Sequence, residues 1–85
     1  MNRFVADTMA MVLFLEKRKL PPRVKQIFAD ASKGKEEIYI PSMVLVEIAY
    51  LSETDKIETS LDDAINMITS NKSFPFLPMS IEITG

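Results

Sequence analysis

The chain contains no cysteine and no histidine, and its only glycines are Gly34 and Gly85. Without cysteine there is no disulfide framework and no thiolate metal site, which fits a reducing cytoplasm. Without histidine, Ser-His-Asp and Cys-His catalysis and zinc sites built on His or Cys are excluded. Two isolated glycines exclude a glycine-rich phosphate-binding loop. Any metal chemistry must use carboxylates, whose oxygens suit Mg²⁺ or Mn²⁺.

Long apolar runs and a strong net charge are also absent. The longest uninterrupted apolar run covers residues 9–15, too short to span a bilayer, and no signal-peptide cleavage pattern follows it. We therefore expect no membrane segment and a cytoplasmic location. The net charge of −2 gives no global basic field for nucleic acid. At 85 residues, 47% hydrophobic and 26% charged, the chain is expected to form one small domain, residues 1–85.

Prolines and Gly34 separate segments with strand-like and with helical apolar patterns. Short apolar runs predict strands at 3–7, 36–41 and 74–79. Helical periods predict helices at 8–19, 22–34, 42–53 and 60–72. The order strand, helix, helix, strand, helix, helix, strand is typical of a parallel α/β sheet. The prolines in the third strand indicate an edge position or strand ends.

Two of the expected helices carry recognisable start signals. Asp7 precedes the helix at 8–19 and is a favoured N-cap residue. Ser60, with Asp63 three residues later, resembles a capping box. We expect the cations at 17–19 to lie in the last turn of the first helix, where they interact favourably with its dipole.

Asp7 has a second interpretation, because it also ends the first expected strand. In open α/β sheets, ligand sites lie at the carboxyl ends of the strands. Asp7 would then lie at the rim of a cleft, beside the first turn of its helix. A plain N-cap and a site residue are both open interpretations from the residues alone.

Glu47 is the single carboxylate of the apolar stretch Val44–Leu51. The helix expected at 42–53 is apolar on most of its circumference, so we expect it to be buried, with Ser42 or a neighbour as its cap. Burying an isolated carboxylate is costly. Glu47 therefore either reaches water or an unseen cation, or it faces Asp7 and shares a divalent cation with it.

Eight further acids that a larger metal site could use fall on expected exposed faces or turns, and none ends an expected strand. They are Asp30, Glu36, Glu37, Glu53, Asp55, Glu58, Asp62 and Asp63. We interpret them as solvated charges.

Three segments together resemble PIN domains. "FVADTMAMVLFLE" resembles their first strand and helix, and "IYIPSMVLVEIAYLSETDKI" resembles their second strand and the helix with the second acid. "FPFLPMSIEIT" resembles their third strand and the start of the next helix. PIN domains are metal-dependent ribonucleases, and many are VapC toxins of bacterial and archaeal toxin–antitoxin pairs. The likeness spans the whole chain.

The resemblance implies a three-layer α/β fold with a parallel sheet and a metal-dependent endoribonuclease site. Asp7 and Glu47 would be catalytic ligands of Mg²⁺ or Mn²⁺ that help a water attack an RNA phosphodiester. Thr8 stands where the family often has a small hydroxyl residue, although an ordinary first-turn threonine explains it equally well. RNA would be the substrate and an antitoxin protein the partner.

The chain departs from the family after the third strand. The family carries a third acid, and usually a fourth, in a later segment, and this chain resembles only about its first two thirds. We therefore expect a truncated, incomplete PIN-like domain with little or no nuclease activity. The first strand, 3–7, would be an exposed apolar edge, so we expect a homodimer or a swapped oligomer.

Two other functions compete with the ribonuclease. A non-catalytic dimerisation or partner-binding half-domain would leave Glu47 merely paired. A DNA-binding regulator is disfavoured by the negative net charge and by strands between the helix pairs. The basic residues Lys17, Arg18, Lys19, Arg23 and Lys25 either contact RNA phosphates or form a solvated helix end and turn.

Overall fold

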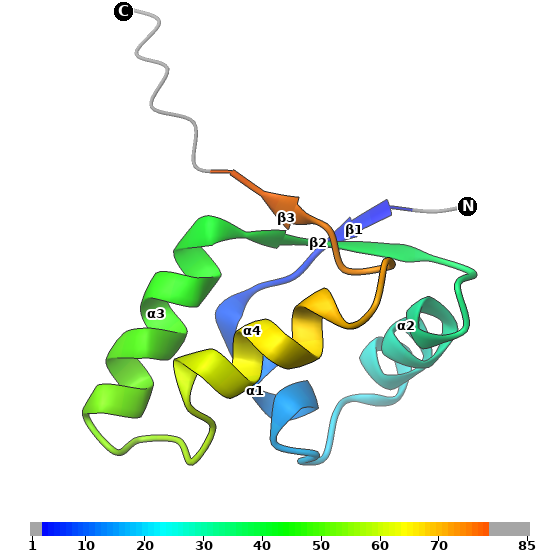
Figure 1. The fold of residues 1–85 in the computed structure, drawn as a ribbon. Helices are drawn as coiled ribbons and strands as arrows, with labels where there is room; N and C mark the ends of the chain where they lie inside the picture. Colours follow the sequence, from blue (N-terminus) through cyan, green and yellow to red (C-terminus); the bar gives the residue numbers. More distant parts are fainter. Residues whose placement is uncertain (1–2, 79–85) are drawn as a thin grey trace, which may run out of the picture.

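The computed structural model describes residues 3–78, which form three short strands and four helices (Figure 1). In chain order these are β1 (Arg3–Val5), α1 (Thr8–Leu15), α2 (Pro22–Ser32), β2 (Glu37–Pro41), α3 (Ser42–Glu53), α4 (Leu61–Thr69) and β3 (Phe76–Leu77). The predicted order of elements is confirmed. Residues 79–85, which include the segment similar to the start of a further PIN helix, lie outside the described residues.

The strands form one parallel sheet with the order β1-β2-β3. Val5 lies opposite Tyr39, and Ile40 lies opposite Phe76. The parallel α/β sheet is therefore confirmed, and among residues 3–78 the strand β3 lies at an edge with prolines at both its ends, as predicted. Within residues 3–78, β1 is the other edge of the sheet.

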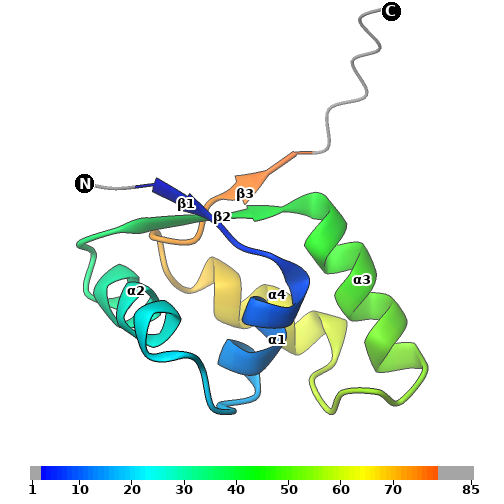
Figure 2. The same ribbon diagram turned by 180° about the vertical axis from the view of Figure 1, so that it is seen from behind.

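All the helices lie on one face of this sheet (Figures 1 and 2). Parallel connections are almost always right-handed, and both connections here step in the same direction across the sheet. Consecutive steps in one direction place their helices on the same face. Residues 3–78 therefore form two layers, and the third layer of the expected fold is not among them.

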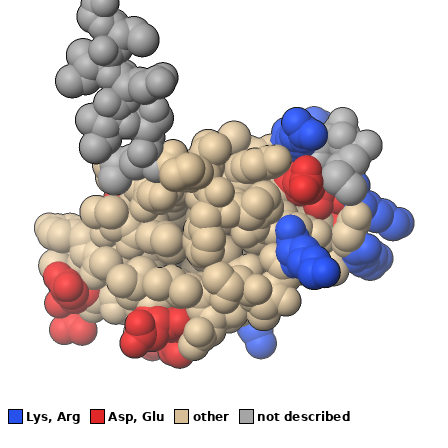
Figure 3. Space-filling model, turned by 45° about the horizontal axis from the view of Figure 1, so that its top comes forward, with Lys and Arg blue, Asp and Glu red and all other residues tan. Residues whose placement is uncertain are grey.

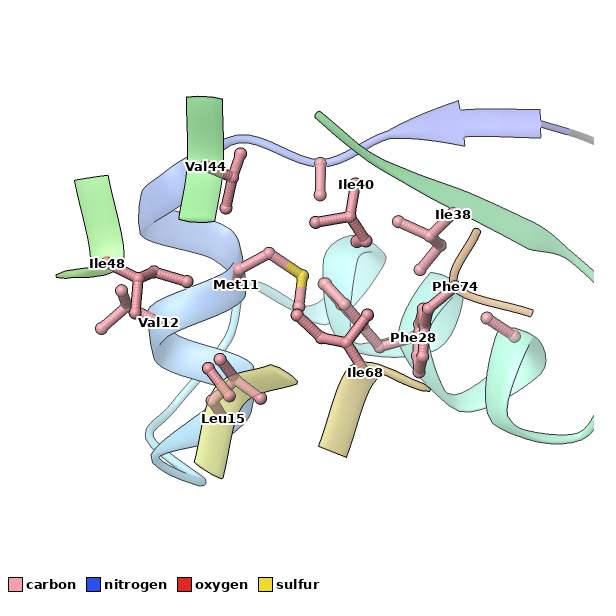
Figure 4. Packing of buried hydrophobic residues seen from close by; sticks show 13 residues of the cluster. Met11, Val12, Leu15, Phe28, Ile38, Ile40, Val44, Ile48, Ile68 and Phe74 are labelled. Carbon is pink, nitrogen blue, oxygen red and sulfur yellow. The ribbon is translucent and has the colours of Figure 1, made fainter. Parts of the chain in front are cut away.

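The hydrophobic core lies between the sheet and its helices. Met11, Ile40 and Ile48 are fully buried there. Met11 extends from α1 toward Ile68, and Ile48 of α3 lies beside Val12 on the other side of α1 (Figure 4). The ring of Phe28 stacks on that of Phe14 with centroids 4.4 Å apart. Apolar burial of this kind is the main source of stability in a domain of this size.

Helix α1 ends at Leu15, four residues before the predicted end. The chain turns at Lys17, which has a left-handed φ of 55°. In this turn Lys17 N–H donates to Phe14 C=O and Arg18 N–H donates to Leu13 C=O. The prediction that residues 17–19 lie in the last helical turn is therefore wrong, because the turn begins before them.

The bounds predicted for α3 are confirmed, and its N-cap is a neighbour of Ser42, although no side chain makes the capping hydrogen bond. Pro41 occupies the N-cap position, and no side chain caps the helix. The Ser42 hydroxyl instead donates to Leu77 C=O at 3.2 Å, which ties the start of α3 to β3. Within residues 3–78, no helix has the length and apolar character that a bilayer crossing requires.

Candidate functional site

Asp7 lies two residues beyond β1 and directly before α1. Its backbone is extended, and its Oδ1 accepts a hydrogen bond from Ala10 N–H at 2.7 Å. The predicted N-cap role is therefore confirmed. The side chain is exposed, and Thr8 beside it is half-buried in the first turn. One oxygen of the carboxylate is engaged by the cap, so Oδ2 is the oxygen available to a ligand.

Glu47 lies on the solvent-facing side of α3, and its side chain is exposed. Only Val44 and Ile48 of this helix are buried, whereas Val46 and Tyr50 beside Glu47 are 54% and 65% exposed. The prediction that α3 is buried on most sides is wrong. The carboxylate reaches water directly, so it carries no burial cost that a metal ion would have to offset.

The topology places Asp7 and the start of α3, the helix that carries Glu47, at the same edge of the sheet. Strands β1 and β2 are parallel, and α1 and α3 follow their carboxyl ends. Helices α1 and α3 also pack together, with Val12 and Ile48 at their contact (Figure 4). No hydrogen bond or ion pair within residues 3–78 joins Asp7 to Glu47 or pairs either acid with a cation. Asp7 thus lies at the edge where α/β proteins bind ligands, and Glu47 lies six residues beyond the end of β2 on the helix that starts there.

A third acidic ligand is not present near these two in the part of the chain that is described. Residues 3–78 contain no group of three or more Asp, Glu, His or Cys side chains placed to hold a metal ion. Two carboxylates suit a weakly held Mg²⁺ or Mn²⁺ that keeps several of its waters.

A basic hollow of about 540 Å³ lies at the connection between α1 and α2. It is lined by Phe14, Lys17, Arg18, Lys19, Leu20, Pro22 and Lys25. Arg23 of the same cluster is exposed on α2. Of these cations, only Arg18 has an ionic partner among the described residues, Glu16, at a long 3.9 Å. The hollow therefore joins several cations to the partly exposed ring of Phe14, a combination that suits phosphate groups and bases.

Glu16 is a carboxylate held by several distant donors, and no local pattern in the sequence indicates it. Its Oε2 accepts hydrogen bonds from Glu58 N–H at 2.8 Å, Thr59 N–H at 2.9 Å and the Thr59 hydroxyl at 3.0 Å. These partners lie more than forty residues along the chain, beyond the reach of any local motif. The side chain is 12% exposed.

The environment of Glu16 makes it a structural anion and not a catalytic base. The Thr59 N–H lowers the pKa of the carboxyl most, and the Thr59 hydroxyl, Glu58 N–H and Arg18 lower it further, against the opposing effect of burial. A carboxylate with a lowered pKa and three donors on one oxygen is a poor proton acceptor. Glu16 instead joins the end of α1 to the connection between α3 and α4.

Comparisons with protein-family models, with curated proteins and with solved structures gave no match to this chain. The resemblance to PIN domains therefore rests on the three sequence segments alone. The function that this resemblance implies for Asp7, Glu47 and the basic hollow stays a prediction.

Proposed function

We propose that the chain carries part of the active site of a PIN-type, divalent-metal-dependent endoribonuclease. Asp7 and Glu47 would hold Mg²⁺ or Mn²⁺. Such an ion, when bound, lowers the pKa of a coordinated water and so supplies a nucleophile for phosphodiester hydrolysis. The observation that supports the proposal most is that Asp7 and the helix that carries Glu47 follow the carboxyl ends of two neighbouring parallel strands, with both acids exposed.

The chemistry of the two side chains fits a loosely held divalent ion. Asp7 offers Oδ2, since Oδ1 caps α1, and Glu47 offers both of its oxygens to solvent. Mg²⁺ and Mn²⁺ prefer such oxygen ligands and keep waters in the remaining positions. We expect low affinity for the metal ion, because residues 3–78 contain no group of three acidic ligands that could hold it tightly.

RNA is the proposed substrate, and the basic hollow is the proposed contact for its phosphates. The hollow offers Lys17, Lys19 and Lys25, and phosphate contacts of this kind position a nucleic acid without reading its sequence. An antitoxin protein is the partner that the resemblance implies. The exposed apolar side chains Val46 and Tyr50, beside Glu47, are the surface that we assign to it.

Metal binding by the intact chain tests the proposal. Titration with Mn²⁺, followed by the relaxation of bound water protons, should show weak binding with a Kd on the order of 1 mM, the range of the weakest carboxylate sites. Asp7→Asn keeps an N-cap and removes the charge, and Glu47→Gln removes the other charge. Each substitution should weaken binding several-fold, and the double variant should abolish it.

Asp62→Asn is the matched control, because Asp62 is an exposed acid in the first turn of α4. It should leave Mn²⁺ binding unchanged. Equal binding by wild type and by the Asp7→Asn, Glu47→Gln double variant would refute the metal site. We also expect little or no RNA cleavage by this chain with Mn²⁺. Cleavage that is abolished in Asp7→Asn would show instead that two carboxylates suffice.

A second candidate function is a non-catalytic partner-binding half-domain. It is favoured by the exposed apolar residues on α3 and by the face of the sheet that no helix of residues 3–78 covers. In that case Glu47 is a solvated charge beside an interaction surface. The same titration separates the two functions, since a binding module predicts no Mn²⁺ site that depends on Asp7 and Glu47.

A further inference from the structure

Within residues 3–78, β1 is an edge of the sheet whose outward backbone groups have no partner strand. Ala6 N–H donates to Tyr39 C=O at 3.0 Å, so Ala6 faces β2. Because backbone polar groups alternate in direction along a parallel strand, the N–H and C=O of Val5 point away from β2. The Val5 side chain is 66% exposed. Residues 3–78 contain no strand on this side of β1.

An apolar hollow of about 180 Å³ lies beside this edge, on the helix side of the sheet. Phe4 and Ala6 of the β1 segment and Val24, Ile27 and Phe28 of α2 line it. A strand added to β1 would close this hollow and remove its lining from water. Backbone pairing and apolar burial would therefore act together.

The charged residues on either side of Val5 indicate which strand could pair with β1. Arg3 and Asp7 lie two residues to either side of Val5. A second copy of β1, paired antiparallel about a twofold axis at Val5, places Arg3 of each copy opposite Asp7 of the other. A parallel pair would align like charges and would not close as a twofold dimer. The edge is thus complementary to itself in one orientation only.

We propose that β1 is the docking site for a second copy of this chain. Val5 of each copy exchanges N–H···O=C bonds with Val5 of the other, and Asp7 N–H donates to Arg3 C=O of the second copy. Asp7 C=O stays within α1, where it accepts from Met11 N–H at 3.1 Å. The two sheets become one continuous sheet with the helices of both copies on the same face. The short edge makes the dimer weak.

A proline at position 5 tests the backbone contact. Val5→Pro removes an N–H that has no partner among the described residues, and proline is tolerated on an edge strand when its nitrogen faces outward. Val5→Thr keeps the N–H and the branched shape. By sedimentation from about 10 µM to about 1 mM, a range suited to weak association, wild type and Val5→Thr should dimerise and Val5→Pro should stay monomeric. Thermal unfolding checks that each variant is folded.

Cysteine cross-linking tests the register without depending on the proline variant. The chain has no native cysteine, so Val5→Cys introduces a single thiol. Directly opposite residues of an antiparallel pair lie about 5.5 Å apart at Cα, within the range that a disulfide spans. Val5→Cys should form a disulfide dimer at least tenfold faster than Met9→Cys, which is similarly exposed on α1. Equal rates would overturn the proposal.

A charge reversal tests the proposed pairing of Arg3 with Asp7 of the second copy and keeps the ion pair within each chain. Arg3 pairs with Glu37 at 3.6 Å, and the double variant R3E/E37K retains that pair in reverse. It places a like charge opposite Asp7 of the second copy, so dimerisation should weaken several-fold, whereas Arg3→Lys should dimerise as wild type does. Unchanged dimerisation by R3E/E37K would contradict the antiparallel register.

If something other than a second copy pairs with β1, these experiments give different results. A wild type that stays monomeric, with the Val5 amide protected from hydrogen exchange, would show that another segment of the same chain covers β1. A dimer that survives Val5→Pro would show that the copies meet elsewhere, for example through the exposed side of α3. Either result overturns the docking site that we propose.

Discussion

At the scale of single residues, Glu16 contributes more to this fold than either of the candidate metal ligands. Its Oε2 accepts from two backbone N–H groups and one hydroxyl of residues 58–59. Asp7, by comparison, accepts one N–H from its own helix, and Glu47 is exposed. Glu16 fixes the connection between α3 and α4 onto the end of α1.

Replacing Glu16 should therefore destabilise the protein. Hydrogen bonds to a charged acceptor contribute about 1.5–3 kcal/mol, and Glu16→Gln cannot satisfy all the donors that converge on Oε2. We expect the free energy of unfolding to fall by about 1–3 kcal/mol, measured by urea denaturation. Glu53→Gln, at the exposed end of α3, is the control. Equal stability of Glu16→Gln and wild type would contradict the anchoring role.

The same residue predicts a pH dependence. The pKa of Glu16 is lowered from its ordinary value of 4.5 in the folded chain, chiefly by Thr59 N–H. At a pH between the folded and the unfolded pKa, the unfolded chain binds more protons than the folded chain. The stabilising contribution of the Glu16 carboxylate is therefore fully present above pH 4.5 and disappears as the pH falls through the folded pKa. The stability difference between wild type and Glu16→Gln should therefore be constant near neutral pH and shrink in acid. A constant difference down to about pH 3 would refute this, since the unfolded carboxyl is protonated there.

At the scale of elements, the ends of α1 and α3 share a feature that the sequence did not signal. Both helices stop at a left-handed residue that is not glycine, Lys17 with φ 55° and Asp55 with φ 57°. Helix α2 instead ends at the glycine that the pattern identified, Gly34, with φ 82°. Gly34 was therefore a correct stop signal, whereas α1 and α3 end in turns that local backbone hydrogen bonds close without a glycine.

Glycine at either left-handed position should stabilise the protein. The left-handed conformation costs an L-residue about 1–2 kcal/mol, and the added freedom of glycine in the unfolded chain cancels part of the gain. Lys17→Gly and Asp55→Gly should each raise the free energy of unfolding by about 0.5–1 kcal/mol, seen as a higher Tm. Lys33→Gly, at a position with φ −91°, should give no gain, and a gain there would contradict this explanation.

At the scale of the whole molecule, the charges are segregated. Residues 17–35 carry seven of the ten Lys and Arg residues, whereas residues 53–63 carry five of the twelve acids. Most Lys and Arg side chains in Figure 3 lie toward the α2 side of the face shown. The net charge of −2 therefore conceals a basic region, and net charge alone is a poor guide to nucleic-acid binding here.

The basic hollow should bind single-stranded RNA in a salt-dependent way, without metal. In EDTA, K19Q/K25Q should weaken binding of a single-stranded RNA oligonucleotide and reduce the slope of log K against log salt by about 0.7 for each phosphate that is no longer neutralised. K33Q/K35Q removes the same charge from the exposed far end of α2 and should change the slope less. Equal effects of the two double variants would refute a localised phosphate site.

The sequence by itself determined the order of the elements, the parallel sheet, the bounds of α3, and the caps at Asp7 and Ser60. These depend on local apolar period, on prolines and on side chains that reach their own helix. Only the tertiary structure decided that Glu47 is exposed, that Glu16 is an anchor and that one sheet face is uncovered within residues 3–78. The reason is physical: each depends on contacts between segments distant in the chain, which a local pattern does not encode.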